Sequence, residues 1–200
     1  VNPVNTQDGA HIQVAYERMC PGDMVCPTFI GTPGPGSPGL ECRVVAQGEQ
    51  SLVFAVAPSA ISANLRQQIL LGYSVSRVCG GEWESPPQKV HVLDISGLPN
   101  LAVEQATGST LDLSTFGGDA SATVVAWPYI ALGQPCWLWV TGELEDGSPY
   151  SFEVLEGVPV TEQWLTGVEA PLPRHELQKL ADCSAFEVHF AVNFNGQLDK

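Results

Sequence analysis

The chain has 200 residues and a formal charge of −14, with 22 Asp and Glu residues against eight Lys and Arg residues. A field of that sign opposes nucleic acid and anionic membranes, so we expect neither as a partner. The composition, 44% hydrophobic and 15% charged residues, is that of a globular protein, and no apolar run approaches the roughly 20 residues of a membrane-spanning helix.

Short segments with alternating apolar residues follow one another through the first half of the chain. Residues 11–17 place Ile12, Val14 and Tyr16 on one face, which predicts a half-buried strand. Residues 31–39, GTPGPGSPG, are too rich in Gly and Pro for a helix or a strand and predict a loop. Residues 59–68 fit a short helix or an irregular crossover. The other predicted strands of this half lie at residues 24–30, 40–46, 51–57, 69–75 and 88–95.

The second half follows Gly97-Leu98-Pro99, where we expect a joint between two domains. Leu177 and Leu180 stand at helical spacing and predict a short helix at residues 174–181. Candidate strands lie at residues 101–104, 110–113, 121–127, 136–142, 150–155 and 186–194. Short strands separated by turns are typical of a β-sandwich, whereas a parallel sheet would need long crossover helices. The sequence therefore predicts an all-β chain.

The two halves share one sequence skeleton. Residues 22–38 match residues 133–149 without a gap, because their Gly, Ser and Pro residues recur at an offset of 111. The match continues upstream, where Tyr16 corresponds to Trp127. A repeat of about 100 residues is the size of a complete domain, so we predict domains at residues 1–95 and 96–200. The repeated positions are mostly turn residues and indicate scaffold, so any specific function belongs to the tryptophans and cysteines that differ.

The two copies differ at their ends. Residues 98–117 have a counterpart that would precede Val1, and the counterpart of strand 88–95 would follow Lys200. We therefore expect the first domain to be truncated at its N-terminal strand and the second to lack its C-terminal strand, as in a longer array. The alternative is that terminal repeats are simply atypical. A missing last strand leaves a sheet edge open to another chain.

Two local patterns resemble a known family. Tyr16-x-x-Met19-x-x-Gly22-Asp23, followed by Phe29-x-Gly31-Thr32, resembles a repeat of large Gram-negative surface and secreted proteins. The second copy, with Trp127-Pro128-Tyr129-Ile130-Ala131 and Asp182-Cys183-Ser184, resembles the companion repeat of the same proteins. The resemblance implies two tandem immunoglobulin-like β-sandwich domains in an adhesin-like protein at the cell surface or outside the cell. It brings no catalytic residues with it.

Six cysteines in a β-rich chain fit an exported protein with disulfides, with free buried thiols as the alternative. A sandwich would place Cys20 and Cys79 at the same end of the first domain. Cys26 and Cys42 flank the loop at 31–39. We therefore predict the pairs Cys20–Cys79 and Cys26–Cys42, and no pairing in the second domain.

Three tryptophans are the candidate binding residues. Trp83 lies in a polar turn and is the best candidate for an exposed contact. Trp137 and Trp139 share one face of their strand, because neighbouring residues point to opposite faces. If Leu138 and Val140 point inward, both tryptophans point outward. There they are either covered by the partner domain or form a surface that binds sugar or protein.

No catalytic or metal site is predicted. His175 with Glu176 and His189 with Glu187 are the main polar groups that a site could use. Ser37 and Ser148 lie in Gly-Ser-Pro turns rather than in a nucleophile elbow. We expect no cofactor. Calcium at the joint between the domains is the one metal considered, since hard cations bind clustered carboxylates and five aspartates lie near loops: Asp94, Asp112, Asp119, Asp146 and Asp182.

The sequence predicts a non-enzymatic structural or adhesive module, a stalk or protein-interaction repeat of an exported bacterial protein. Its expected partners are a protein or glycan receptor and further repeats of the same chain. The alternative is a carbohydrate-binding module that uses exposed tryptophans.

Overall fold

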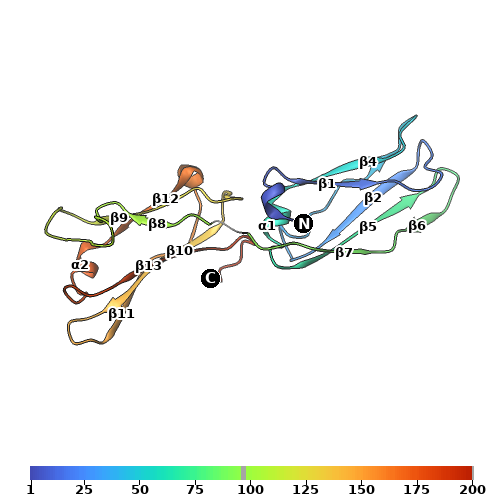
Figure 1. Cartoon of the computed structure of the whole chain (residues 1–200). Helices are drawn as coiled ribbons and strands as arrows, with labels where there is room; N and C mark the ends of the chain where they lie inside the picture. Colours follow the sequence, from blue (N-terminus) through green and yellow to red (C-terminus); the bar gives the residue numbers. More distant parts are fainter. Residues whose placement is uncertain (96–97, 200) are drawn as a thin grey trace. The chain divides into compact units, whose positions relative to one another are not determined.

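The computed structural model describes residues 1–95 and 98–199. The chain divides into two compact units, Val1–Ser96 (unit 1) and Gly97–Lys200 (unit 2). Both consist mainly of β-strands in antiparallel sheets, with a few short helices (Figure 1). The prediction of an all-β chain is confirmed. None of the helices in the described part of the chain has the length and apolar character of a membrane span.

Unit 1 contains two sheets. In one sheet β1 (Ala10–Val14) pairs with β4 (Leu52–Val56). In the other, β2 (Met24–Ile30) lies between β3 (Arg43–Val44) and β5 (Gln68–Ser76). The outer edge of β5 is paired first by β6 (Glu82–Glu84) and then by β7 (Gln88–His91). Two short helices complete the unit, the 3-10 helix η1 (Pro3–Asn5) and α1 (Pro58–Ser62).

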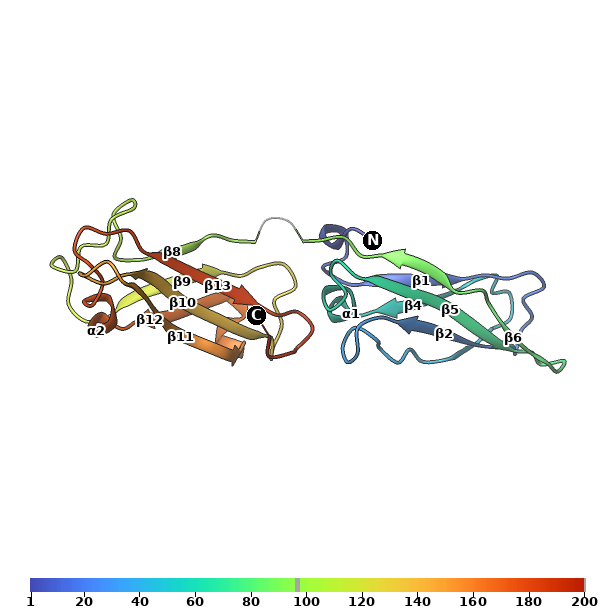
Figure 2. The ribbon, with the colours of Figure 1, turned by 90° about the horizontal axis from the view of Figure 1, so that it is seen from below.

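Unit 2 contains two three-stranded sheets. One has the order β12 (Gly167–Leu172), β9 (Ala120–Val125), β8 (Leu101–Val103). The other has the order β11 (Pro149–Pro159), β10 (Pro135–Glu143), β13 (Glu187–Val192). The 3-10 helix η2 (Glu162–Thr166) precedes β12, and α2 (Arg174–Leu177) follows it. Figure 2 shows β13 beside β10, with β11 on the other side of β10.

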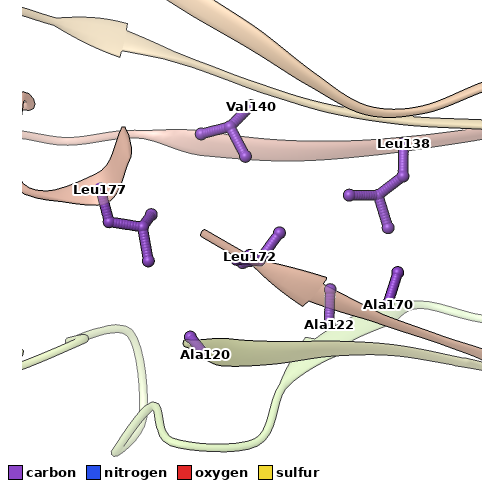
Figure 3. Packing of buried hydrophobic residues seen from close by; sticks show 7 residues of the cluster. All are labelled: Ala120, Ala122, Leu138, Val140, Ala170, Leu172 and Leu177. Carbon is purple, nitrogen blue, oxygen red and sulfur yellow. The ribbon is translucent and has the colours of Figure 1, made fainter. Parts of the chain in front are cut away.

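The core of unit 2 lies between its sheets. Leu138 and Val140 of β10 face the small residues of β9 and β12, and Leu177 of α2 closes one end (Figure 3). Strand alternation explains this arrangement, because Ala120, Ala122 and Val124 are buried while the residues between them are partly exposed. Full burial of a Leu or Val side chain contributes about 1.5–3 kcal/mol.

The core of unit 1 is built in the same way. Buried side chains from both sheets meet in one cluster: Val14, Val25, Val45, Leu52, Phe54 and Val75. In each unit, buried apolar side chains from both antiparallel sheets therefore meet in the core.

Positions at the offset of 111 make matching hydrogen bonds. Tyr16 Oη donates to Asp23 Oδ2 over 2.9 Å, and Trp127 Nε1 donates to Gln134 Oε1 over 3.2 Å. Both acceptor side chains are buried. The neighbouring backbone repeats the pattern, since Gly22 N donates to Val45 O and Gly133 N donates to Val160 O.

The predicted loop at 31–39 is confirmed, and it is held by a residue that the sequence did not single out. Asn64 is fully buried. Its Oδ1 accepts the Thr32 N–H over 2.7 Å, and its Nδ2 donates to the Gly36 and Ala60 carbonyls at 2.7 Å each. A Cβ at Gly31 would stand 2.3 Å from Asn64 Oδ1, so the loop needs glycine there.

Several strand predictions were wrong or incomplete; among them, the strand predicted at residues 88–95 ends at His91. Residues 110–113 form no strand, because the backbone N–H and the side-chain hydroxyl of Ser114 both donate to Asp112 Oδ1 and turn the chain locally. Of residues 40–46, only β3 is strand. Strand β12 was missed because it contains Gly167 and Pro171; its place at a sheet edge tolerates the proline.

Candidate functional site

Trp83 is the most exposed tryptophan candidate. The predicted turn was wrong: Trp83 lies in strand β6, where it pairs with Val75 of β5, and 65% of its surface is exposed. Its neighbours Glu82 and Glu84 are exposed as well. The indole is therefore presented on a short edge strand whose backbone is held by the sheet.

Trp137 is covered, although it shares the outward face of β10 with Trp139. Leu138 and Val140 point into the core and are fully buried, as alternation requires, yet Trp137 is itself only 5% exposed. Opposite Trp137 the pairing of β10 with β11 shifts register, and Gly157 adopts a positive φ of 62°. A Cβ at Gly157 would stand 3.7 Å from the Trp137 ring and 3.2 Å from Leu198. The two tryptophans therefore form no shared exposed platform.

Trp139 stacks on His189, its direct neighbour on β13. The ring centroids are 5.0 Å apart and the planes differ by 13°. His189 Nε2 also lies 2.8 Å from Thr141 Oγ1 and 3.4 Å from Glu187 Oε2. Both Trp139 and His189 are half-buried, so the stack offers a partly exposed flat surface.

A cavity of about 520 Å³ runs beside this stack within unit 2. We call it the β13 cleft; its walls are residues 98–101, Val124, Trp127, Trp139 and residues 188–192. Val188, Phe190 and Val192 belong to the inward face of β13, and His189 belongs to its outward face. The cleft therefore borders both faces of β13, and residues 98–101, which lead into β8, form its other wall.

One of the two predicted disulfides is present. Cys26 and Cys42 are bonded, with their Cα atoms 4.2 Å apart. The predicted Cys20–Cys79 bond was wrong, since both thiols are free and exposed. They do lie at one end of unit 1, because the N–H groups of Cys20 and Val78 both donate to Asp23. However, Cys20 Sγ points to the Arg18 carbonyl of its own turn, at 3.3 Å.

The remaining cysteines are also free. Cys136 is buried in unit 2, and burial raises the pKa of its thiol to about 12. Cys183 is exposed. Cys136 and Cys183 are not bonded to each other.

Asp23 is a buried charged residue at the centre of a network that the sequence did not reveal. Its carboxylate accepts hydrogen bonds from Tyr16 Oη, Cys20 N and Val78 N, and Arg77 Nη1 lies 3.4 Å away. Burial opposes the charged form, but the hydrogen bonds from Val78, Tyr16 and Cys20 and the Arg77 charge together hold the pKa of Asp23 below its ordinary value. Burial and the Asp23 carboxylate raise the pKa of Tyr16 to about 12. The network therefore stabilises one end of unit 1. The sequence signal that could have found it is the repeat, which aligns Tyr16 with Trp127 and Asp23 with Gln134.

The loop aspartates serve local structure. Asp112 and Asp146 each accept hydrogen bonds from a serine two residues later, Asp119 accepts the Arg174 N–H, and Asp94 pairs with Arg66. Within residues 1–95 and 98–199, no group of three or more His, Cys, Asp or Glu side chains is placed to hold a metal ion. The joint where calcium was considered includes residues 96 and 97, which lie outside the described residues.

The polar residues considered for catalysis have structural partners. Ser37 Oγ donates to the Gly31 carbonyl, and Ser148 Oγ donates to Asp146. Glu176 contacts His175 at 3.2 Å, Lys179 at 2.8 Å and the Tyr150 hydroxyl. These contacts hold turns and α2 in place.

Comparisons with known proteins do not assign the chain to a family. No family model matches the chain, and no curated protein matches it. Among the matching solved structures is one described as "Ca2+-stabilized adhesin helps an Antarctic bacterium reach out and bind ice", at 12% identity and a TM-score of 0.33. The match covers 96% of this chain and 44% of that one, so the chain spans less than half of that structure's length. At this TM-score the match carries no argument about fold or function.

Proposed function

We propose that the chain is a non-enzymatic structural or adhesive module made of two tandem immunoglobulin-like β-sandwich domains. The pairing in unit 1 supports the fold, because β1 pairs with β4 while β2, β5 and β7 follow one another in the opposite sheet. This corresponds to strands B with E, and C with F and G, of an immunoglobulin domain. The matched hydrogen bonds of Tyr16 to Asp23 and Trp127 to Gln134 support the repeat.

The exposure of Trp83 is the observation that carries the adhesive part of the proposal. A tryptophan that is 65% exposed on a paired strand loses little freedom when a partner covers it. Tryptophan is enriched among residues that dominate binding energy. We therefore assign Trp83 and its neighbours on β6 as a protein-binding surface.

Location outside the cell or at its surface is part of the same proposal. The Cys26–Cys42 disulfide supports it, because such bonds persist in oxidising compartments. The excess of 14 negative charges favours basic or neutral partners over nucleic acid.

The first test is to probe arrays of purified proteins and of glycans with the full chain. We expect binding to at least one protein on the array, and we expect Trp83→Ala to weaken it by about tenfold or more, a loss of about 1.4 kcal/mol or more. Val44→Ala is the matched control, since Val44 is 59% exposed on β3 of the same sheet. Binding that ignores Trp83→Ala, or no protein bound at all, would contradict this assignment.

A carbohydrate-binding module is the second candidate. It is favoured by the stack of Trp139 on His189, which lines the β13 cleft. Binding on the glycan array that Trp139→Ala removes and Trp83→Ala leaves unchanged would support it. No bound glycan would eliminate it.

A further inference from the structure

Strand β12 is the last strand of its sheet among the described residues, because it pairs only with β9. Beyond the end of β8, Glu104 N donates to the Ser121 carbonyl of β9, so Ser121 directs its backbone groups away from β12. Alternate residues of a strand direct their backbone groups to opposite sides. Ala170, opposite Ala122, therefore bonds to β9, and the carbonyl of Glu169 points to the outer edge of β12.

A second cavity of unit 2, of about 510 Å³, lies along this edge, and we call it the β12 cavity. All three β12 residues that direct their backbone groups outward line it, together with Trp164 and Gln163 of η2, the helix that leads into β12 (Figure 1). Asp119 and Ser121 line it too, and Ser121 Oγ donates to Glu169 Oε1 over 3.0 Å. No Lys or Arg is among its lining residues. The cavity therefore combines carboxylates, a strand-edge carbonyl and a half-buried indole.

Unit 1 shows which chemical group such an edge binds. Strand β4 is likewise the last strand of its sheet in the described part of the chain. There Arg43 Nη1 donates to the Val53 carbonyl over 3.0 Å, and Arg43 Nη2 lies 3.5 Å from Glu49 Oε1. The edge carbonyl of β4 is therefore bonded to a guanidinium that also pairs with a carboxylate.

The pairing of the strands makes Glu169 the counterpart of Val53. Each follows a buried residue that pairs with a buried valine of the neighbouring strand: Leu52 opposite Val14 in unit 1, and Val168 opposite Val124 in unit 2. The Glu169 carbonyl is therefore the counterpart of the carbonyl that the arginine of unit 1 binds.

Unit 2 supplies no such arginine from its described residues. At the offset of 111, Val154 stands in the place of Arg43. The two basic residues of the described part of unit 2 have other partners: Arg174 donates to carbonyls of residues 113–118, and Lys179 pairs with a glutamate of α2. A guanidinium at this edge therefore has to come from outside unit 2.

We propose that the β12 cavity binds an arginine side chain of a partner protein. The guanidinium donates to the Glu169 carbonyl, the carboxylates of Glu169 and Asp119 balance its charge, and its flat face lies against the Trp164 indole. Arginine fits better than lysine, because its planar fork bonds two acceptors and stacks on a ring. The net charge of −14 attracts a basic segment to the chain. The site deepens the proposed protein-interaction function and rests on it, adding unit 2 as a second contact surface.

The probe is N-acetyl-arginine amide, added to the isotope-labelled full chain and followed by NMR. We expect saturable shifts of the Trp164 indole N–H and of the amides of residues 167–171. N-acetyl-citrulline amide, which has nearly the same shape without the charge, should cause no saturable shift. N-acetyl-lysine amide should bind about threefold more weakly than the arginine probe.

A charge-removing variant tests the position of the site. Glu169→Gln should weaken the arginine probe about fivefold, because it removes a carboxylate beside the guanidinium. Glu169 is exposed, so the change leaves the core intact. Glu156→Gln is the matched control, since Glu156 is exposed on β11 and lies outside the cavity. It should change the affinity less than about twofold, because exposed charges at a distance are screened.

The same variants test the partner. Proteins that bind the full chain on the array should bind Glu169→Gln about fivefold more weakly and Glu156→Gln almost unchanged. Unchanged affinity of every bound protein for Glu169→Gln would overturn the proposal. Self-association of the chain that Glu169→Gln abolishes, measured by light scattering, would overturn it too, because the arginine would then belong to a second copy.

No saturable shift with the arginine probe, equal shifts with the citrulline probe, or equal effects of Glu169→Gln and Glu156→Gln would also overturn the proposal. Failure of the arginine probe while Trp83-dependent binding persists would refute only the β12 cavity. Loss of Trp83-dependent binding with a functioning probe would refute only the Trp83 surface.

Discussion

A single buried residue, Asp23, stabilises one end of unit 1. Asp23 is charged, 1% exposed and surrounded by donors from three segments of unit 1. A buried charge without partners is costly, whereas one with several hydrogen bonds fixes the segments that supply them. The Tyr16 ring, with Arg77 Cζ 5.0 Å from its centroid, covers the same network.

Replacing Asp23 should destabilise the protein. We expect Asp23→Ala to lower the free energy of unfolding by about 3 kcal/mol, because it leaves the Tyr16 hydroxyl and two backbone N–H groups without their acceptor and removes the ion pair with Arg77. Urea unfolding measures the change. Asp8→Ala, at an exposed position, should change stability little.

The same substitution gives a pH dependence. Folding lowers the pKa of Asp23, so its contribution is complete above the unfolded-state pKa of about 3.9 and is lost as pH falls through the lower folded-state pKa. The stability difference between wild type and Asp23→Ala should therefore be largest at neutral pH and shrink below about pH 3.9. A difference that stays constant down to pH 2.5 would argue against a charged Asp23.

At the scale of elements, the two units differ in how the edges of their sheets are paired and in how their loops are ordered. The outer edge of β5 is paired by β6 and β7, while β13 pairs only with β10 among the described residues. The Gly/Pro loop at 31–39 has no ladder partner and is ordered instead through Asn64, just beyond the C-terminal end of α1. The order of this loop therefore depends on hydrogen bonds to one buried side chain rather than on pairing within a sheet.

Asn64→Ala should therefore release the loop. Three hydrogen bonds are lost and the Gly36 carbonyl and Thr32 N–H lose their partners, so we expect a loss of about 2 kcal/mol. Hydrogen exchange should increase at residues 31–37 and much less in β2 and β5. Asn5→Ala, at an exposed position in η1, is the control. Unchanged exchange at residues 31–37 would show that the loop is held by other contacts.

At the scale of the whole molecule, the oxidation state of the six cysteines depends on the redox conditions around the protein. The structure has one disulfide and four free cysteines among the described residues. Three of the four free thiols are exposed and only Cys136 is buried. Disulfide bonds persist mainly in oxidising compartments, which is the observation behind the proposed location.

Mass mapping without reductant should find the Cys26–Cys42 bond and four free thiols. Removing the bond by Cys26→Ser with Cys42→Ser should lower stability by about 3 kcal/mol, because the two cysteines are 16 residues apart and the bond restricts the unfolded chain. The paired replacement of Cys20 and Cys79 by Ser is the control and should have little effect. Six free thiols in protein taken from its native source would contradict the proposed exported location.

The sequence by itself determined the all-β class, most strand positions and the repeated skeleton, because these depend on local alternation and turn residues. It located β2 residue for residue and the helix at α2. It also predicted that Leu138 and Val140 share the inward face, since this follows from strand periodicity alone.

Only the tertiary structure decided which of the candidate residues are accessible. Trp137 and Trp139 are equivalent in the sequence pattern, yet Trp137 is buried beside Gly157 while Trp139 lines the cleft. Cys20 and Cys79 meet at one end of unit 1, yet their side chains do not bond. Asn64 and Asp23 act through contacts between segments far apart in the chain. Accessibility and pairing depend on such long-range contacts, which no local pattern encodes.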